Sequence, residues 1–279
     1  FYLQLHDVLV SVLGYKRSTQ DPGLYYLQNP EGGKPLSLVT LHVDDIAAVA
    51  KHETYLQNLH DALQHRFKDV TLSKEPTQFL GVEVTRTEGT IKLSQAGYAI
   101  EVAKRWGIEV LQEERPITPH DKDLFVIDLE SPKADTTQYK AILGCIMYLQ
   151  ITYPEIGVDL IFFQSRIKDP RIQDIEKMKR CIKYIVQKRE VGGWVRKSPD
   201  YQITGTVDAS HNILTDGTSI TGYTLTLGGG ATPILCGAIK QKCIALSSCE
   251  AEYVSWSNVA MKAMFLYQLL EEVGFKQQG

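Results

Sequence analysis

Several features that would place a protein in a familiar class are missing from this sequence. Its 279 residues contain no apolar run of about 18 residues, the length a membrane-spanning helix needs. The opening FYLQLHDVLVSVLGYK lacks the basic start and small-residue cleavage site of a signal peptide. The five cysteines form no C-x-x-C pair, so neither a zinc site of that pattern nor a disulfide framework is indicated. These absences predict an intracellular protein, cytoplasmic or nuclear, without a membrane span.

A surplus of charge of one sign is also missing. The formal net charge is -3, whereas nucleic-acid-binding domains usually carry a marked basic surplus, so any such binding must be local. Lysines and arginines do concentrate between Lys168 and Lys197, where they could face a phosphate backbone. Asp174, Glu176 and Glu190 interleave with them, and a solvated helix face explains the pattern equally well.

Hydrophobic periodicity predicts an α+β protein long enough for two domains, or for one domain and part of a second. Helices are expected over residues 1–13, 53–67, 95–106, 137–151, 155–167, 171–188 and 248–272. Strands are expected over residues 23–27, 36–43, 79–94 with a turn at Glu88-Gly89, 192–197, 201–210, 219–228 and 232–246, and directly after Asp45. The proline-containing segment 107–135 is predicted to be a connecting loop. A helical block thus separates two strand-rich regions.

Asp44 and Asp45 are the first candidate chemical groups. They interrupt an apolar strand pair and should lie at the tip of a hairpin. Charges without a partner resist desolvation, so two adjacent carboxylates favour the binding of a divalent metal ion. Phosphoryl-transfer enzymes hold two Mg²⁺ ions about 3.5–4 Å apart between carboxylates. Taken alone, an Asp-Asp dipeptide is more often an exposed turn.

Three smaller motifs are predicted to be structural. Gly228–Gly230 lack the context of a phosphate-binding loop and should form a hairpin turn. Ser247 and Ser248 are interpreted as helix N-caps, because no histidine is placed by pattern to activate a nucleophile. Cys145 and Cys181 fall on apolar helical faces and should be core residues.

The context of Asp44 and Asp45 carries a family resemblance. LVTLHVDDIAAVA resembles the tyrosine-valine-Asp-Asp signature of reverse transcriptases. DPGLYY, FLGVEV, IKLSQAGY, QYKAILGCIMYLQITYPEIGVD and CIKYI resemble, in order, landmarks of the Ty1/copia group of LTR retrotransposons over nearly the whole chain. Two departures are visible: His42 stands where the family usually has an aromatic residue, and Tyr153 where an arginine usually precedes Pro154. His42 is interpreted as an ordinary strand residue.

The C-terminal segment resembles the start of an RNase H domain. The stretches TGTVDAS, SITGYTLTLGGG and KQKCIALSSCEAEY are similar to the copia-type pattern, and the last is the most specific motif in the chain. The resemblance implies that Asp208 on the first strand and Glu252 on the following helix meet as metal ligands. Glu250 would be a first-turn carboxylate favoured by the helix dipole.

The resemblance implies a fold, cofactors and partners for the chain. Residues 1–110 would be the end of a reverse transcriptase palm with the thumb, residues 111–190 a connecting loop and helical connection, and residues 191–279 part of an RNase H-like mixed sheet and helix. Asp44, Asp45, Asp208 and Glu252 would be the catalytic, metal-binding residues, with Mg²⁺ or Mn²⁺ as cofactor. The implied partners in a full-length, particle-associated parent are RNA template, DNA primer, RNA–DNA hybrid, dNTP and the other polyprotein segments.

The two implied active sites are expected to be incomplete in this chain. The family carries a further palm aspartate well before the Asp-Asp pair and further RNase H aspartates beyond the helix of Glu252. We therefore expect that the chain alone neither polymerises nor cleaves efficiently, and that its RNase H-like sheet leaves an exposed edge. The alternative hypothesis is a decayed or co-opted remnant that acts without catalysis, as a nucleic-acid or protein binding module.

Overall fold

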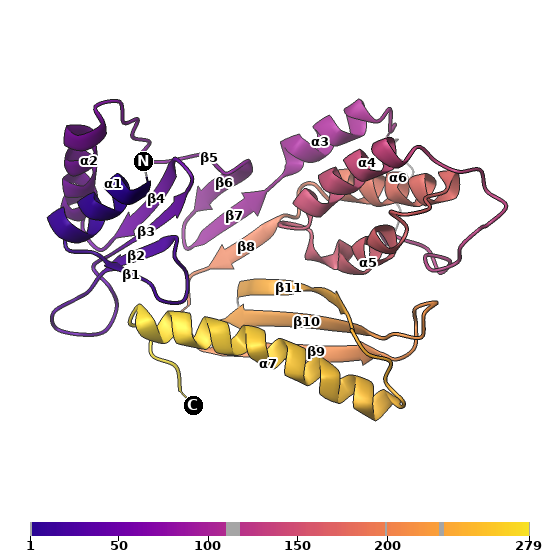
Figure 1. The fold of residues 1–279 in the computed structure, drawn as a ribbon. Helices are drawn as coiled ribbons and strands as arrows, with labels where there is room; N and C mark the ends of the chain where they lie inside the picture. The colour runs from indigo at the N-terminus through magenta and orange to yellow at the C-terminus, as the bar shows by residue number, and fades with distance from the viewer. Residues whose placement is uncertain (1, 110–117, 199, 229–231, 279) are drawn as a thin grey trace. The chain divides into compact units, whose positions relative to one another are not determined.

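The computed structural model describes residues 2–109, 118–198, 200–228 and 232–278 (Figure 1). It divides into two compact units. Unit 1 comprises Phe1–Leu80, Asp200–Ile203 and Met261–Gly279, and unit 2 comprises Gly81–Pro199 and Thr204–Ala260. Helix α7 (Ser248–Glu272) continues from unit 2 into unit 1. The mixture of helices and antiparallel sheets confirms the predicted α+β class.

Unit 1 is built on a four-stranded antiparallel meander. Its elements are α1 (Tyr2–Asp7), the π-helical turn η1 (Val8–Val12), β1 (Lys16–Arg17), β2 (Leu24–Leu27), β3 (Ser37–His42), β4 (Asp45–Ala50), α2 (Glu53–Phe67) and β5 (Gln78–Phe79). The sheet order is β1-β2-β3-β4. Its core combines one face of the sheet with both helices, through Leu5, Leu9, Tyr25, Val39 and Leu59. The predicted helices over 1–13 and 53–67 are confirmed, and Gly14, at a φ of 73°, ends the first.

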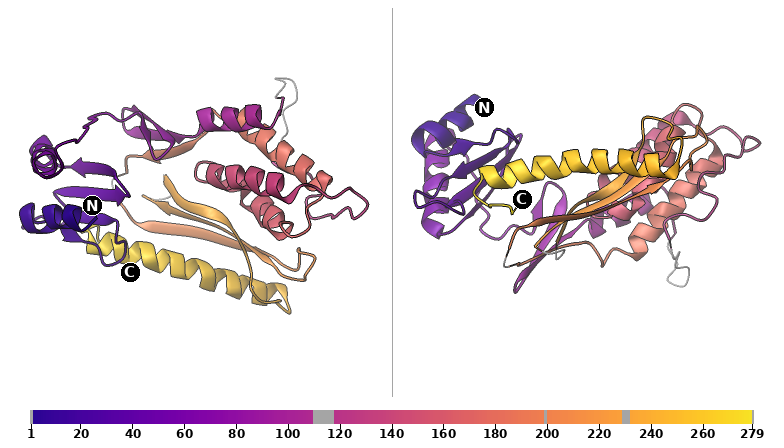
Figure 2. Two further views of the ribbon diagram at one scale, coloured as in Figure 1. Left: turned by 45° about the horizontal axis from the view of Figure 1, so that its top comes forward. Right: turned by 90° about the horizontal axis from the view of Figure 1, so that it is seen from below.

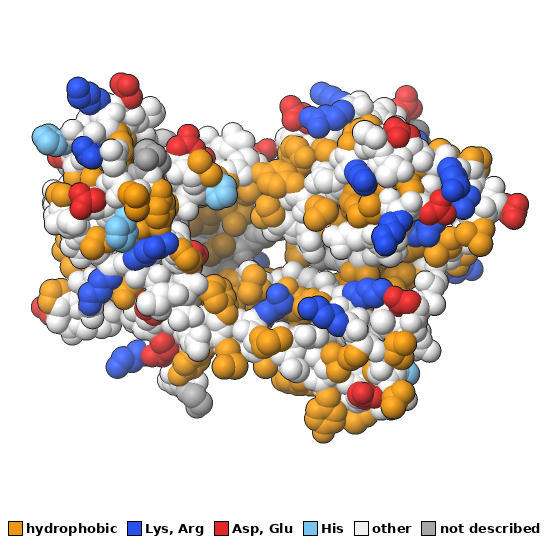
Figure 3. All heavy atoms as spheres, in the orientation of Figure 1, with side chains coloured by type: hydrophobic (Ala, Val, Ile, Leu, Met, Phe, Trp, Pro, Cys, Tyr) orange, Lys and Arg blue, Asp and Glu red, His pale blue; other side chains and the backbone are white. Residues whose placement is uncertain are grey.

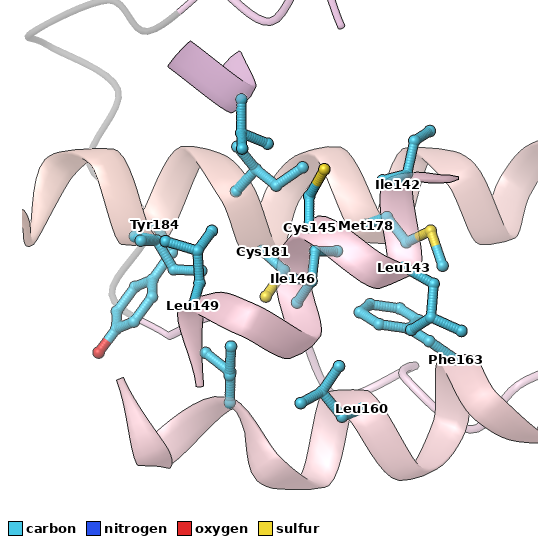
Figure 4. Close-up of a cluster of buried hydrophobic side chains, with 14 of the residues drawn as sticks. Ile142, Leu143, Cys145, Ile146, Leu149, Leu160, Phe163, Met178, Cys181 and Tyr184 are labelled. Atoms are coloured by element: carbon cyan, nitrogen blue, oxygen red, sulfur yellow. The ribbon is translucent and has the colours of Figure 1, made fainter. Parts of the chain in front are cut away.

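Unit 2 contains a helical block that forms most of its core. The block consists of α3 (Ala96–Arg105), α4 (Thr136–Leu149), the 3-10 turn η2 (Pro154–Ile156), α5 (Gly157–Ser165) and α6 (Ile172–Gln187). Asp135 caps α4 by accepting hydrogen bonds from the backbone of Thr137 and Gln138. Figure 4 shows side chains of α4, α5 and α6 meeting in this core, Cys145 and Cys181 among them. Both cysteines are buried, as predicted.

The basic segment after Lys168 forms α6, and several of its charges serve the fold. The α6 side chains Ile175, Met178 and Ile182 are spaced by three and four residues and face the core. Lys177, on the same helix, donates hydrogen bonds to three backbone carbonyls of the preceding loop. On the face shown in Figure 3, blue Lys and Arg side chains over the helical block are interspersed with hydrophobic and acidic ones.

Unit 2 also contains two sheets. Strands β6 (Val82–Thr87), β7 (Thr90–Ser94) and β8 (Gly193–Arg196) pair antiparallel in that order, with Gly89 in the predicted turn at a φ of 73°. Strands β9 (Ile203–Ser210), β10 (Ile220–Leu227) and β11 (Thr232–Lys240) form the second sheet, in the order β11-β10-β9. Figures 1 and 2 show the first half of α7 lying along this sheet.

One edge of the second sheet is covered within unit 2. A Cβ built on Gly157, the first residue of α5, would lie 2.9 Å from the backbone nitrogen of Ala238 in β11, so only a glycine permits this approach. The helical block therefore covers β11.

Of the loop predicted over 107–135, residues 110–117 lie outside the described residues, as do Gly229 and Gly230 of the predicted glycine turn. None of the helices in the described ranges has the length and apolar character needed to cross a membrane.

Candidate active site

Asp44 and Asp45 lie at the tip of the β3–β4 hairpin, as predicted. His42 pairs with Asp45 across the two strands, which leaves Val43 and Asp44 as a two-residue turn. All four residues are exposed at this tip. His42 is thus the last residue of β3, in keeping with its interpretation as a strand residue.

The turn has an unusual backbone. Val43 has a φ of 58°, a left-handed conformation that a β-branched residue rarely adopts, and its side chain is 79% exposed. This conformation costs a non-glycine residue about 1–2 kcal/mol. Such strain is found more often at functional sites than elsewhere, because the surrounding structure must hold it in place. The apolar strands on both sides fix the turn that presents the two carboxylates.

The two carboxylates fit a divalent metal ion by their chemistry. Carboxylate oxygens are the ligands preferred by Mg²⁺. Neither Asp44 nor Asp45 makes a hydrogen bond or an ion pair with another side chain in the part of the chain that the structure describes. Their ligand oxygens are therefore accessible from solvent. In the same described ranges, no group of three or more His, Cys, Asp or Glu side chains is arranged to hold a metal ion.

The structure brings Glu252 to the strand that carries Asp208. Asp208 is exposed near the end of β9, and Glu252 lies in the second turn of α7. The backbone N–H of Ala209 donates a hydrogen bond of 3.2 Å to Glu252 Oε1. Glu252, far from Asp208 in the sequence, thus lies beside the strand that carries Asp208, within unit 2. Asp44 and Asp45 belong to unit 1.

Glu250 has a structural role at the start of α7. Its carboxylate accepts a hydrogen bond of 2.7 Å from the backbone of Leu246, and its own N–H donates to Ser247 Oγ at 3.1 Å. Ser247 is therefore an N-cap, as predicted, whereas Ser248 is the first residue of the helix itself. These bonds fix the first turn of the helix that carries Glu252.

The structure also shows a cleft that contains none of the four predicted residues. It has a volume of about 820 Å³, lies within unit 2 and is lined by residues of α4, η2, β8, β10 and β11. Tyr153, one of the two departures from the family pattern, is among them and is only 1% exposed. Burial raises the pKa of its hydroxyl to about 12. The departure therefore places a neutral, buried ring at this position.

Gln241, which lies near Glu252, was not identified as a functional candidate from the sequence. Gln241 is buried between β10 and α7, where its side chain hydrogen-bonds to both elements. A glutamine between Lys240 and Lys242 gives no sequence signal of burial. Only its place inside the KQKCIALSSCEAEY motif could have drawn attention to it.

Sequence comparisons find several proteins to which the chain is similar. Residues 1–119 match the family model described as reverse transcriptase (RNA-dependent DNA polymerase). The retrovirus-related Pol polyprotein from transposon RE1 of Arabidopsis thaliana is 28% identical over 278 residues, which cover 99% of this chain and 18% of that polyprotein. The chain is thus similar, over nearly its whole length, to copia-type retrotransposon polyproteins, and its first 119 residues match the reverse transcriptase model.

Further relatives support this homology and the fold. The putative transposon Ty5-1 protein of Saccharomyces cerevisiae is 26% identical over 254 residues, which cover 90% of this chain and 80% of that protein. The foamy viral protease-reverse transcriptase, solved in complex with an RNA/DNA hybrid, matches 82% of this chain and 28% of its own, with a TM-score of 0.51 and 15% identity. This likeness shows a reverse transcriptase-like fold. The chain spans about a fifth of the length of the RE1 polyprotein, 18%.

Proposed function

We propose that this chain is part of the RNA-directed DNA polymerase and ribonuclease H of a copia-type retrotransposon. The observation that carries the proposal is the exposed Asp44–Asp45 pair, held at the tip of a strained hairpin inside the region that matches the reverse transcriptase family. In this proposal residues 1–110 are the palm end and thumb, 111–190 the connection, and 191–279 the start of the RNase H-like domain.

Asp44 and Asp45 would hold Mg²⁺, or Mn²⁺ in its place, for DNA synthesis. Asp208 and Glu252 would hold it for cleavage of the RNA strand of a hybrid. When bound, two such ions activate the attacking oxygen and stabilise the leaving one. The residues of this chain supply oxygen ligands and fix their position. Asp44 and Asp45 do so through the hairpin, and Glu252 through its bond to the β9 backbone.

The proposed partners are an RNA template, a DNA primer, an RNA–DNA hybrid, dNTP and the remaining polyprotein segments. The foamy viral relative was solved with an RNA/DNA hybrid, which supports a hybrid as partner here. Contacts to a duplex backbone carry little sequence information, so we expect little base specificity. Nothing in the described residues favours the alternative, a binding module without catalysis.

The first test measures metal binding at the two pairs. Addition of Mn²⁺ should broaden the backbone NMR signals around Asp44 and Asp45, and the variant Asp44→Asn should reduce that broadening. Glu88→Gln is the matched control, because Glu88 is a single exposed carboxylate at the turn of the β6–β7 hairpin. Equal broadening at Glu88 and at the Asp44–Asp45 tip would contradict a specific metal site.

The second test measures activity of the chain as it stands. Each pair contributes only two carboxylates among the described residues, and losing a ligand commonly costs orders of magnitude in rate. We therefore expect very slow Mg²⁺-dependent primer extension and very slow cleavage of an RNA–DNA hybrid. Robust extension that Asp44→Asn abolishes would show that the chain is an active polymerase and overturn this part of the proposal.

A further inference from the structure

Gln241 lies at the junction between β11 and the loop that leads to α7. Its backbone N–H donates to Ser219 O at 2.9 Å, which extends the β10–β11 pairing by one residue. The residue is 1% exposed. Its side chain thus enters the space between the sheet and α7, where its Nε2 finds partners and its buried Oε1 finds none among the described residues.

The amide of Gln241 joins the helix to the sheet. Its Nε2 lies 2.9 Å from Ala251 O and 3.1 Å from Ser255 Oγ, both on α7. It lies 3.2 Å from Thr221 Oγ1 on β10. The Thr221 and Ser255 hydroxyls are 2.7 Å apart, which closes the cluster. Gln241, Thr221 and Ser255 are all buried, so the cluster is shielded from water and is costly to break.

The cluster bonds to Ala251 and Ser255, the two helix residues on either side of Glu252. Ala251 and Ser255 lie one helical turn apart on the buried face of α7. Glu252 follows Ala251 and therefore projects about 100° around the helix from it, at the rim of the buried face. From there its carboxylate reaches the backbone N–H of Ala209, directly after Asp208. A slip of α7 by one residue would rotate Glu252 by about 100° and move it by about 1.5 Å along the axis.

We propose that Gln241 is the positioning residue of the second carboxylate pair: its buried amide fixes the rotation and height of α7, and so holds Glu252 beside Asp208. The claim that this arrangement matters for metal binding rests on the proposed function. The claim that Gln241 orients Glu252 does not, because the hydrogen bond between Ala209 and Glu252 can be observed without metal. The two claims can therefore fail separately.

The first measurement tests the position without metal. In the variant Gln241→Leu the side chain keeps about its volume and loses its hydrogen bonds. We expect the Ala209 amide to lose its hydrogen-exchange protection and its NMR signal to shift as it does in Glu252→Ala. An unchanged Ala209 signal in a folded Gln241→Leu protein would overturn the proposal.

Gln95 provides a matched control in the same unit. It is a second buried glutamine, at 0% exposure, whose side chain donates to Tyr148 O at 3.1 Å and accepts from Thr152 Oγ1 at 2.9 Å. Gln95→Leu should lower the melting temperature of unit 2 as Gln241→Leu does, while the Ala209 signal stays in place. A loss of the Ala209 bond in both variants would show a general effect of destabilisation and would overturn the specific role of Gln241.

The second measurement uses Mn²⁺ itself as probe. Residues that orient metal ligands commonly contribute 10–100-fold to metal affinity. We expect Gln241→Leu to weaken Mn²⁺ binding at Asp208 and Glu252 by about tenfold or more. Gln95→Leu should leave it unchanged. If the unmodified chain shows no Mn²⁺-dependent broadening around Asp208 and Glu252, the proposed metal site is wrong, while the Ala209 measurement still decides the role of Gln241.

If Gln241→Leu fails to fold, the variant Ser255→Ala tests the role of the cluster instead. It removes one hydroxyl from the cluster and leaves the bond from Gln241 to Ala251 O intact. We expect a smaller change of the same kind at Ala209. An unchanged Ala209 signal together with unchanged Mn²⁺ affinity in this variant would count against the proposal.

Discussion

Asp44 and Asp45 are held side by side by the chain itself, at a turn closed by the pairing of His42 with Asp45. Ala209 and Glu252, 43 positions apart, meet only because α7 packs along the β9–β11 sheet. The first pair is therefore local, and its geometry depends on one strained turn. The second pair is composite, and its geometry depends on the packing of unit 2. This difference predicts which substitutions disturb each pair.

A second contrast separates these carboxylates from the structural ones. Asp159 is fully buried and lies 2.9 Å from His120 Nδ1, and Asp174 is 2% exposed and lies 3.2 Å from Arg166 Nε. Asp44, Asp45 and Asp208 are exposed. Asp159 and Asp174 are thus buried and paired, whereas Asp44, Asp45 and Asp208 face solvent.

The largest effect should follow a cavity in the core of unit 2. Phe163, on α5, is fully buried, and Phe163→Ala should reduce the free energy of unfolding by about 3–5 kcal/mol. Because α5 packs on β11, the Ala209–Glu252 bond should weaken, while the NMR signals of the Asp44–Asp45 hairpin stay unchanged. Ile151→Ala, at a side chain 60% exposed, is the control and should change stability by less than about 0.5 kcal/mol. Simultaneous loss of the hairpin would break the distinction between a local and a composite pair.

A smaller effect, of opposite sign, should follow relief of the strained turn. Val43→Gly should stabilise unit 1 by about 0.5–1 kcal/mol in denaturant unfolding, because glycine adopts a positive φ without strain but loses more entropy on folding. Val49→Gly is the matched control, since it lies in the same hairpin, within β4, and should destabilise by roughly 1 kcal/mol. If both variants destabilise equally, the turn at Val43 is not strained.

The smallest effect concerns the buried carboxylate Asp159. Its hydrogen bond to His120 raises the pKa of that histidine above its ordinary 6.5, and burial partly opposes the shift. Asp121 also raises this pKa, and Arg180 lowers it. Because the pKa is higher in the folded state, the stabilisation is fully present below pH 6.5 and is lost as the pH rises through the folded-state pKa.

This pH dependence can be measured by urea unfolding at about pH 5 and about pH 8.5. The difference between the two midpoints should shrink in His120→Asn. His65→Asn, at an exposed histidine on α2, is the control and should leave the difference unchanged. A titration curve of His120 at its ordinary pKa would contradict the pairing.

Local patterns were enough to predict many elements of the fold. The apolar residues of α2, spaced by four, predicted the bounds Glu53–Phe67 that the structure shows. The Asp44–Asp45 hairpin followed from two apolar runs and a polar tip. In each case the determining contacts lie within a few residues of one another, so the sequence contains them directly.

Contacts between distant segments could not be predicted in this way. Residues 192–197 were correctly expected to form a strand, but no pattern reveals that β8 pairs with β7, with Gly193 opposite Leu93. The basic segment gave no sign that Lys177 turns inward to three backbone carbonyls. The approach of Glu252 to the strand of Asp208 was implied only by family resemblance, because it depends on the packing of α7.

The composition of unit 1 has a consequence for how the protein is made. Glu272, at the end of α7, accepts hydrogen bonds of 2.7 Å from Ser18 Oγ and from the backbone of Thr19. A ribosome adding about 5–20 residues per second needs roughly 10–40 s to reach Glu272 after the first 80 residues have been made. During that interval the N-terminal meander lacks the end of α7, so its strands are exposed to pairing with other chains. We therefore expect the rate of translation over this interval, or a chaperone bound during it, to affect the yield of folded protein.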